Sequence, residues 1–246
     1  MLTYKISATP STNLYLKELI KNVPFQEGIL VVTHNQTKGR GQMGNVWHSQ
    51  NGKSLTFSVL KDVFKLEIHN QFYISMAVSL AIKMVLDSYK IPELKIKWPN
   101  DILSSNKKLC GILIENAIKE TTVKSSIIGI GLNVNETEFD KLPNATSMHI
   151  VTGVVSDLEE ILNKIVDALA FYFLFLKENR LIELKDLYLL CLFGKDKVSH
   201  FKSPAGLSFN GIIRGVSSHG KLQVELENEI IKEFDIKEIE MRIGSI

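Results

Sequence analysis

A short segment with three glycines, residues 39–44, stands between two apolar, β-branched runs, 28–34 and 54–60. Such runs favour buried strands, so the arrangement predicts a hairpin-like pair of strands with the glycine segment at one end. Glycine backbone can turn its amide groups toward an anion, and Arg40 inside the segment adds a planar, charged group that suits phosphate. We therefore expect this loop to hold a phosphorylated molecule.

This segment partly matches two nucleotide-binding motifs but fulfils neither of them. The pattern Gly-x-Gly-x-x-Gly of dinucleotide-binding folds needs a helix that opens within the glycines. Here a turn signal at residues 51–52 and the strand-like run 54–60 follow instead. Residues 52–54, Gly-Lys-Ser, resemble the end of a Walker A loop, but the position of its first glycine is occupied by Trp47. Neither motif accounts for the loop.

Composition and charge exclude several classes of protein. A chain of 246 residues can form one large domain with a small appendage. The net charge of +2, without a dense Lys/Arg run, predicts no binding to nucleic acid, and no apolar run suits a membrane span or a signal peptide. Two distant cysteines, Cys110 and Cys191, indicate reduced thiols in a cytoplasmic protein. The six histidines are scattered, so we expect no structural zinc site.

Periodicity predicts an α+β fold, a mixed β-sheet with helices packed on it. The run 69–89 lacks glycine and proline and repeats apolar residues at helical spacing, so we expect a long helix there. Residues 10–13 precede another helical pattern and would serve as its N-cap even without a further role. From about Gly194 short strands separated by turns predict a β domain over 194–246, on the scale of an SH3-like barrel, after a main domain over 1–193. The other expected helices are 157–179 and 181–193, and the other expected strands are 95–98, 109–114, 126–135, 197–201, 207–216, 221–227 and 230–234.

Three further stretches are candidates for chemistry. Residues 97–101, Lys-Trp-Pro-Asn-Asp, place amide and carboxylate groups and a large ring at a strand end, although an ordinary turn also explains them. Lys108, beside the strand 109–114, is either an exposed solubilising charge or a cation that neutralises phosphate, and this stretch alone favours the first. Gly129 and Gly131 have the same parity in a strand, which opens space above one face for a flat or bulky ligand.

Four stretches, taken in order, resemble the biotin protein ligases. They are Ser-Thr-Asn at 11–13, the glycine loop with its arginine and tryptophan at 39–47, the motifs within 97–115, and Gly-Ile-Gly-Leu-Asn at 129–133. The resemblance implies a fold like those of class II aminoacyl-tRNA synthetases and biotin ligases, with an SH3-like C-terminal β-barrel. It also implies an ATP-dependent reaction that makes biotinyl-5′-AMP and passes biotin to a lysine of a carrier protein.

The resemblance implies roles for single residues. Lys108 and Arg40 would stabilise the reacting carboxylate and α-phosphate, and Asp101 would orient the carrier lysine or accept its proton. Mg²⁺ would be held by the phosphates of ATP, without a dedicated protein metal site. The implied biotin-binding residues are Ser11, Thr12, Asn13, Gln36, Gly39, Arg40, Gly41, Lys108, Gly111, Gly129 and Gly131. The implied ATP- and adenylate-binding residues are Arg40, Gln42, Trp47, Asn100, Lys108 and Asn133.

The resemblance also suggests partners. The expected partner is the biotin carboxyl carrier domain of a biotin-dependent carboxylase, while the oligomeric state stays open between a monomer and a homodimer. Since the motifs begin by Ser11, we expect a monofunctional enzyme without the N-terminal DNA-binding domain of bifunctional relatives. Many relatives carry arginines where this chain has Gln42, Met43 and Asn45, and one of those arginines helps to retain the adenylate. Retention is therefore in question here.

Three other interpretations compete. A lipoate or octanoate ligase shares the fold and the adenylation chemistry, but it usually lacks the 97–101 turn and the Gly-Arg-Gly loop with its tryptophan. A regulator that holds biotinyl-AMP without transferring it is disfavoured by the presence of both Lys108 and Asp101. A purely structural module gives no reason for Arg40 and Asn100 to occur together with these two residues.

Overall fold

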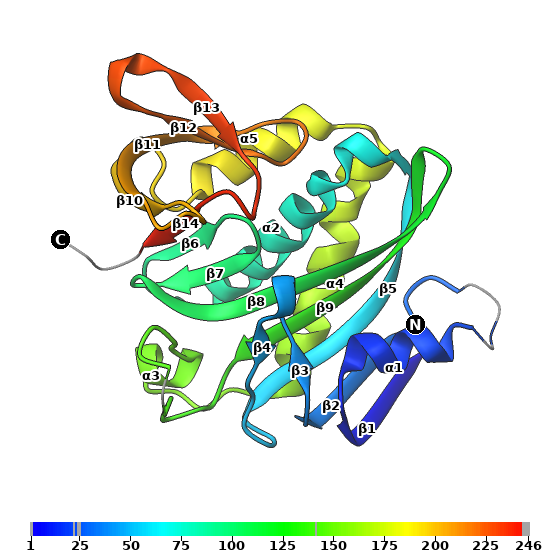
Figure 1. Ribbon diagram of the computed structural model, residues 1–246. Helices are drawn as coiled ribbons and strands as arrows, with labels where there is room; N and C mark the ends of the chain where they lie inside the picture. Colours follow the sequence, from blue (N-terminus) through cyan, green and yellow to red (C-terminus); the bar gives the residue numbers. More distant parts are fainter. Residues whose placement is uncertain (1, 22, 24–25, 141, 243–246) are drawn as a thin grey trace.

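A seven-stranded sheet forms the centre of the molecule (Figure 1). The computed structural model describes residues 2–21, 23, 26–140 and 142–242. Across the sheet the strands follow the order β1-β2-β5-β9-β8-β7-β6; β1 and β2 run parallel, and all later neighbours are antiparallel. The strands are β1 (Thr3–Thr9), β2 (Leu30–Gln36), β5 (Ser54–Glu67), β6 (Leu94–Lys97), β7 (Asp101–Ser104), β8 (Lys107–Lys119) and β9 (Thr122–Asn133).

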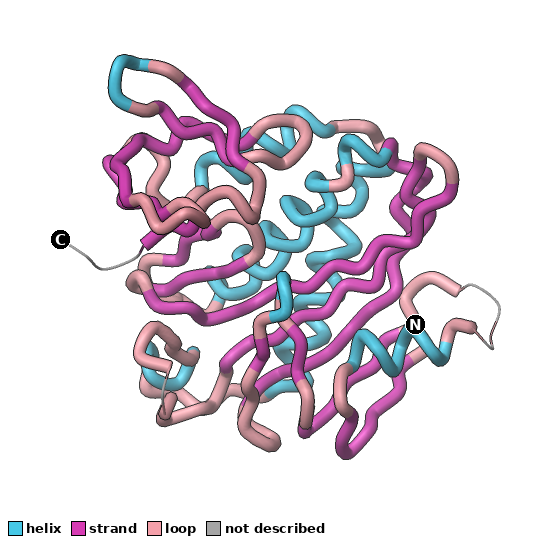
Figure 2. Tube along the Cα trace, viewed as in Figure 1, coloured by secondary structure: helices cyan, strands magenta, loops and turns pink. Residues whose placement is uncertain are grey.

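The two faces of the sheet are covered by different helices. The helices are α1 (Thr12–Leu19), α2 (Phe72–Ser88), α3 (Met148–Thr152), α4 (Leu158–Lys177) and α5 (Leu181–Cys191), with 3₁₀ turns η1 (Gln42–Gly44), η2 (Ile68–Asn70) and η3 (Glu227–Glu229). Figure 2 shows α2 and α4 on one face, where Phe57 and Ile130 join the main apolar core. Alternate strand residues such as Leu60 and Ile127 face α1 and form a smaller core with Leu16. None of the helices in these described ranges is long and apolar enough to cross a membrane.

Most long elements predicted from periodicity are confirmed. The helix expected over 69–89 is η2 followed by α2, and the runs 28–34 and 54–60 form the antiparallel pair β2 and β5. The glycine loop is itself a small hairpin of β3 (Gly39–Arg40) and β4 (Val46–Trp47). Neither this hairpin nor β1 and α3 was expected, because two-residue strands and a short, partly exposed edge strand give weak periodic signals.

The C-terminal region forms a second antiparallel sheet in the order β13-β12-β11-β10-β14. This sheet is the small C-terminal β region that the sequence predicts, and in the described residues its outer strands β13 and β14 do not pair with each other to close a barrel. One apolar core continues from the main sheet into this one. Its strands are β10 (Val198–Lys202), β11 (Ser208–Val216), β12 (Leu222–Glu225), β13 (Ile231–Phe234) and β14 (Glu240–Arg242).

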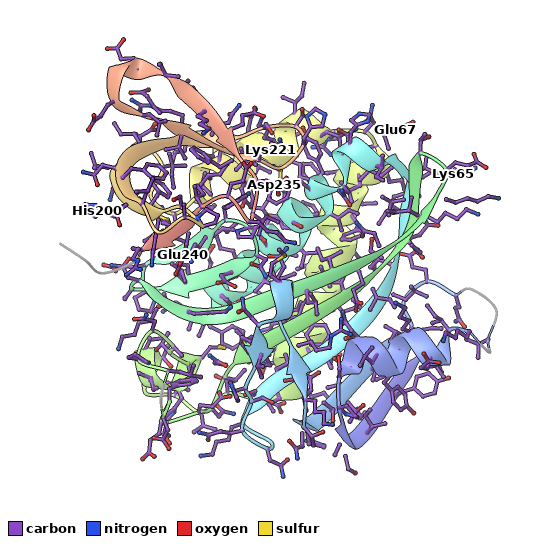
Figure 3. All side chains as sticks on the ribbon, viewed as in Figure 1. Lys65, Glu67, His200, Lys221, Asp235 and Glu240 are labelled. Atoms are coloured by element: carbon purple, nitrogen blue, oxygen red, sulfur yellow. The ribbon has the colours of Figure 1, made fainter. Side chains whose placement is uncertain are left out.

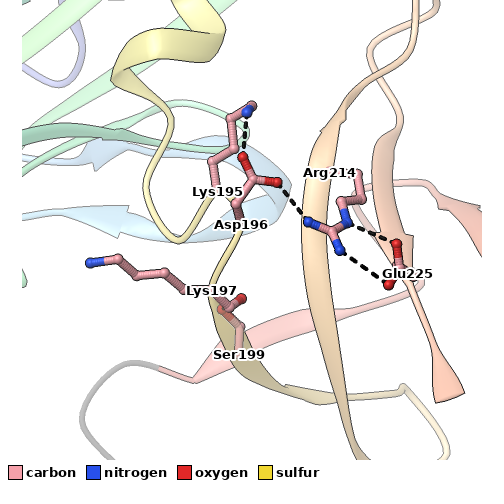
Figure 4. Close-up of polar contacts among 6 residues, drawn as sticks. All are labelled: Lys195, Asp196, Lys197, Ser199, Arg214 and Glu225. Carbon is pink, nitrogen blue, oxygen red and sulfur yellow. Dashed lines mark hydrogen bonds and ion pairs between the residues drawn. The ribbon is translucent and has the colours of Figure 1, made fainter. Parts of the chain in front are cut away.

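An exposed ion-pair network ties the start of this sheet to its middle strands (Figure 4). The Arg214 guanidinium on β11 donates to both carboxylate oxygens of Glu225 on β12, over 2.8 and 3.2 Å. It also donates to Asp196, which precedes β10, over 2.9 Å. Because exposed ion pairs add little stability, the network fixes geometry more than it contributes free energy.

The turn between β11 and β12 anchors the second sheet on the main domain. The Trp98 indole N–H donates to the Gly220 carbonyl over 2.9 Å, and Trp98 itself is buried. Gly220 has φ +83°, and an added Cβ would lie 2.5 Å from Cγ of Phe72 at the start of α2. Only glycine combines this backbone angle with this close approach.

Gly220→Ala is expected to lower the free energy of unfolding by about 1–3 kcal/mol, from backbone strain plus overlap with Phe72. Thermal unfolding measures the effect. Gly206→Ala is the matched control, since Gly206 has φ +85° and open space around its Cβ position. Equal melting temperatures for the two variants would show that the contact with Phe72 carries no constraint.

Candidate active site

A cavity of about 310 Å³ opens on the face of the sheet that carries α1. Its walls include the β3–β4 hairpin, the turn between β6 and β7, and residues 236, 239 and 240 of the C-terminal region. The structure brings most predicted site residues together here, while Gly39 and Asn133 lie outside the lining. The predicted residues that line the cavity are Ser11, Thr12, Asn13, Gln36, Arg40, Gly41, Gln42, Trp47, Asn100, Asp101, Lys108, Gly111, Gly129 and Gly131.

The start of α1 is joined to the sheet by a polar network. The Thr12 backbone N–H donates to Gln36 Oε1 over 2.9 Å, which satisfies one of the free amides of the first helical turn. The Ser58 hydroxyl lies 2.7 Å from Thr12 Oγ1 and 2.6 Å from Asn13 Oδ1. Ser11 stands at the N-cap position, but its buried side chain makes no capping bond. These polar groups can therefore serve a ligand at this end of the cavity.

Trp47 packs against the glycines of β8 and β9. A Cβ on Gly131 would fall 2.3 Å from Trp47 Cε2, and one on Gly111 would fall 3.1 Å from Cζ3. A Cβ on Gly129 would fall 2.3 Å from Asn13 Oδ1. The expectation of open space above this face is thus corrected, because this chain's own Trp47 and Asn13 fill the space closest to the glycines.

Arg40 lies on the hairpin above this face. Its Nη2 atom is 3.6 Å from Glu115 Oε1, and the other Glu115 oxygen accepts from Asn13 Nδ2 over 2.8 Å. Gly39 supports the hairpin rather than the cavity wall, since its added Cβ would lie 2.3 Å from the Trp47 carbonyl oxygen. The Arg40 side chain keeps 44% of its surface exposed, so it can turn toward an anion in the cavity.

A second positive centre lies beside the Trp47 ring. Lys108 Nζ is 2.7 Å from Asp101 Oδ1 and 5.7 Å from the centre of the Trp47 ring. Lys97 stands opposite Asp101 in the strand register of the β6–β7 hairpin, and it also lines the cavity. Burial lowers the pKa of Lys97, and Lys108 lowers it further, whereas Asp101 opposes the shift. Two neighbouring ammonium groups on one wall suit a ligand with several negative charges.

The two predicted asparagines have different surroundings. Asn100 Nδ2 donates to the Ile112 carbonyl over 2.8 Å, and the Ile112 N–H donates to the Asn100 carbonyl over 3.0 Å. This double contact fixes the 97–101 turn on β8. Asn133 is 3% exposed, and its Nδ2 donates to the Thr146 carbonyl over 2.9 Å.

Several buried polar atoms in and near the site have no hydrogen-bond partner in the described part of the chain. They include Trp47 Nε1, Ser54 Oγ, Thr56 Oγ1 and Asn133 Oδ1. Ser54 and Asn133 pair across β5 and β9, and Thr56 lines the cavity. Glu136 is buried as well, and burial raises its pKa to about 7 although nearby backbone amides and Lys53 lower it. Because unpaired buried polar atoms are costly, this region is suited to a polar ligand.

The structure adds site residues that sequence interpretation did not assign. Lys97 stood inside a recognised motif but received no role, and Ser58 lay within a predicted strand. Ile236, Ile239 and Glu240 reach the cavity from the C-terminal region, and local sequence gives no sign of this long-range contact.

A model of the Biotin/lipoate A/B protein ligase family matches residues 6–133, just over half of the chain. The chain belongs to this family. Relatives include the bifunctional ligase/repressor BirA of Bacillus spizizenii, 37% identical over 167 residues that cover 65% of this chain and 49% of that protein. Another is the biotin–[acetyl-CoA-carboxylase] ligase of Mycobacterium tuberculosis, 30% identical over 167 residues that cover 65% of this chain and 60% of that one. The chain spans about half the length of the first of these relatives.

Solved structures of family members have the same fold. The biotin protein ligase from Aquifex aeolicus in complex with biotin and ATP superposes with a TM-score of 0.80 at 27% identity, over 99% of both chains. The predicted α+β fold, with a mixed sheet, packed helices and a small C-terminal β region, is thereby confirmed.

Proposed function

We propose that this family member is an ATP-dependent biotin protein ligase. The observation that carries the proposal is a single cavity with a polar hydrogen-bonding end near Thr12 and Gln36 and a cationic end with Lys97 and Lys108. A ligand that joins a polar ring to a carboxylate matches this division. The relatives named as biotin ligases and the Aquifex aeolicus complex with biotin and ATP support the choice of ligand.

The first half-reaction joins two anions and therefore needs cations. A biotin carboxylate oxygen attacks the α-phosphorus of ATP, the P–O bond to the β-phosphate breaks, and pyrophosphate leaves. Lys108, now paired with Asp101, would move its ammonium group to the carboxylate and α-phosphate. Arg40 would neutralise the same groups from the hairpin side. Its weak contact with Glu115, at 3.6 Å, costs little to release.

The two ends of the adenylate would bind at opposite ends of the cavity. Thr12, Asn13 and Gln36 would hydrogen-bond the biotin ring. The unpaired atoms of Trp47 and Asn133 would receive the adenosine part, once the segment near Asn133 opens toward the cavity. Mg²⁺ would be bound mainly through the ATP phosphates.

The second half-reaction would transfer biotin to protein. A carrier lysine nitrogen attacks the carbonyl carbon of the mixed anhydride, the C–O bond to phosphate breaks, and AMP leaves. Asp101, with 17% of its side chain exposed, would accept the lysine proton after Lys108 has turned to the phosphate. The proposed partner is a biotin carboxyl carrier domain, and a cytoplasmic location, expected from the unpaired Cys110 and Cys191, belongs to the same proposal.

Pyrophosphate release in the absence of carrier tests the first half-reaction. We expect release that requires both biotin and ATP and is weaker with lipoate or octanoate. Preference for lipoate or octanoate would replace the proposal with a lipoyl-type ligase.

Gln42→Arg is expected to slow the escape of biotinyl-AMP by about tenfold, since a cation on the cavity wall would pair with the adenylate phosphate. Release of free adenylate after a single turnover measures the effect. Gln42→Ala removes the amide without adding charge and should not slow release. Equal release by Gln42→Arg and the unmodified protein would exclude position 42 as a determinant of retention.

A further inference from the structure

Glu240 places a carboxylate on the cavity wall. It is an exposed residue of β14, at the junction with the β6–β7 hairpin (Figure 3). In the part of the chain that the structure describes, its carboxylate makes no hydrogen bond, but its charge acts on the nearby Lys97 and partly opposes the lowering of that pKa by burial. Asp101, the other carboxylate in the lining, differs because it is held by Lys108 at 2.7 Å.

The negative charge of Glu240 is at odds with the anions of the first half-reaction. Biotin carboxylate and ATP phosphates would be repelled by Glu240, whereas Arg40, Lys97 and Lys108 attract them. The cationic reactant is the ammonium group of the carrier lysine, which enters from solvent. A carboxylate at the exposed rim is therefore matched to the second half-reaction.

The neighbours of Glu240 favour a lysine side chain over a metal ion. Ile236 and Ile239 line the same cavity and offer apolar surface to the methylene chain of a lysine, while Glu240 meets its charged end. Mg²⁺ would need several oxygen ligands, whereas a lysine ammonium group can be bound by a single carboxylate.

We propose that Glu240 is a positioning residue that binds the ε-ammonium group of the carrier lysine at the cavity rim. This inference rests on the proposed ligase function. The ammonium then passes to Asp101 and loses one proton there. The neutral nitrogen attacks the carbonyl carbon of the anhydride, AMP leaves with the electron pair of the broken C–O bond, and the second proton of the nitrogen goes to the departing phosphate as the amide forms. Glu240 accepts no proton and forms no covalent bond.

The test is a single-turnover transfer assay with preformed biotinyl-AMP and a biotin carrier domain. Glu240→Gln should reduce the second-order transfer rate about tenfold relative to the rate of pyrophosphate release, through weaker binding of carrier. Glu240→Asp keeps the charge and should restore most of the rate. With hydroxylamine, a neutral nucleophile, in place of the carrier, Glu240→Gln should match the unmodified protein.

Glu238→Gln is the matched control, because Glu238 lies outside the cavity lining and accepts from the Asp235 N–H. It should transfer like the unmodified protein. Normal transfer by Glu240→Gln would overturn the proposal. Equal losses with carrier, with hydroxylamine and in pyrophosphate release would also overturn it, by placing Glu240 at the adenylate. Absence of biotin-dependent pyrophosphate release from the unmodified protein would instead reject the ligase function itself.

Discussion

Lys108→Ala is expected to reduce biotin-dependent pyrophosphate release by about 10²- to 10³-fold, the usual effect of losing one group that stabilises charge in the transition state. Lys108 and Lys97 share one cavity wall, but Lys97 is the more deeply buried and its pKa is lowered by that burial. Lys108 has 38% of its side chain exposed and can leave Asp101 for the phosphate. Its loss also frees the Asp101 carboxylate, which would then repel both reacting anions.

Lys107→Ala is the matched control for this variant. Lys107 is the exposed neighbour at the start of β8 and does not line the cavity, so its release rate should stay near that of the unmodified protein. Melting temperatures show whether either variant is misfolded. Near-normal pyrophosphate release by a folded Lys108→Ala variant would remove Lys108 from the catalytic centre.

Gly131→Ala is expected to reduce pyrophosphate release more than tenfold and to lower the free energy of unfolding by about 1–3 kcal/mol. The added Cβ would stand 2.3 Å from Trp47 Cε2, well inside van der Waals contact. The indole must then move, and its movement would disturb both its contact with Lys108 and the strand pairing of the β3–β4 hairpin. Thermal unfolding and the release assay measure the two effects.

A double-mutant cycle isolates the contact. In a Trp47→Ala background the clash is absent, so the further change Gly131→Ala should cost much less stability than it does alone. Purely additive losses would show that Trp47 does not pack against Gly131 in solution.

The fold was largely predictable where one element shows its own period. The helix at 69–89 and the strands at 54–60 and 126–135 have uninterrupted apolar patterns, so their burial follows from local sequence. The edge strand β1 alternates weakly and is mostly exposed, which leaves little signal. Closure of a barrel depends on whether β13 meets β14, and no local pattern decides that contact.

The site was predictable in its residues but only partly in its geometry. The equal parity of Gly129 and Gly131 correctly indicated a close approach to the sheet, yet the approaching groups are Asn13 and Trp47. The resemblance placed Lys108 and Asp101 in one motif region, but the sequence does not show that their side chains form an ion pair. Glu240 could not be found from sequence, since β14 reaches the cavity through the packing of the second sheet.

Intact-mass analysis of a biotin carrier domain, incubated with this protein, ATP and Mg²⁺, tests the central claim most directly. Biotin, lipoate and octanoate would be supplied in separate reactions, with a carrier whose acceptor lysine is replaced by arginine as the control. The ligase proposal predicts a biotin-sized mass gain on one lysine, dependent on ATP and absent from the control carrier. A mass gain with lipoate or octanoate alone, or none with any acid, would contradict it.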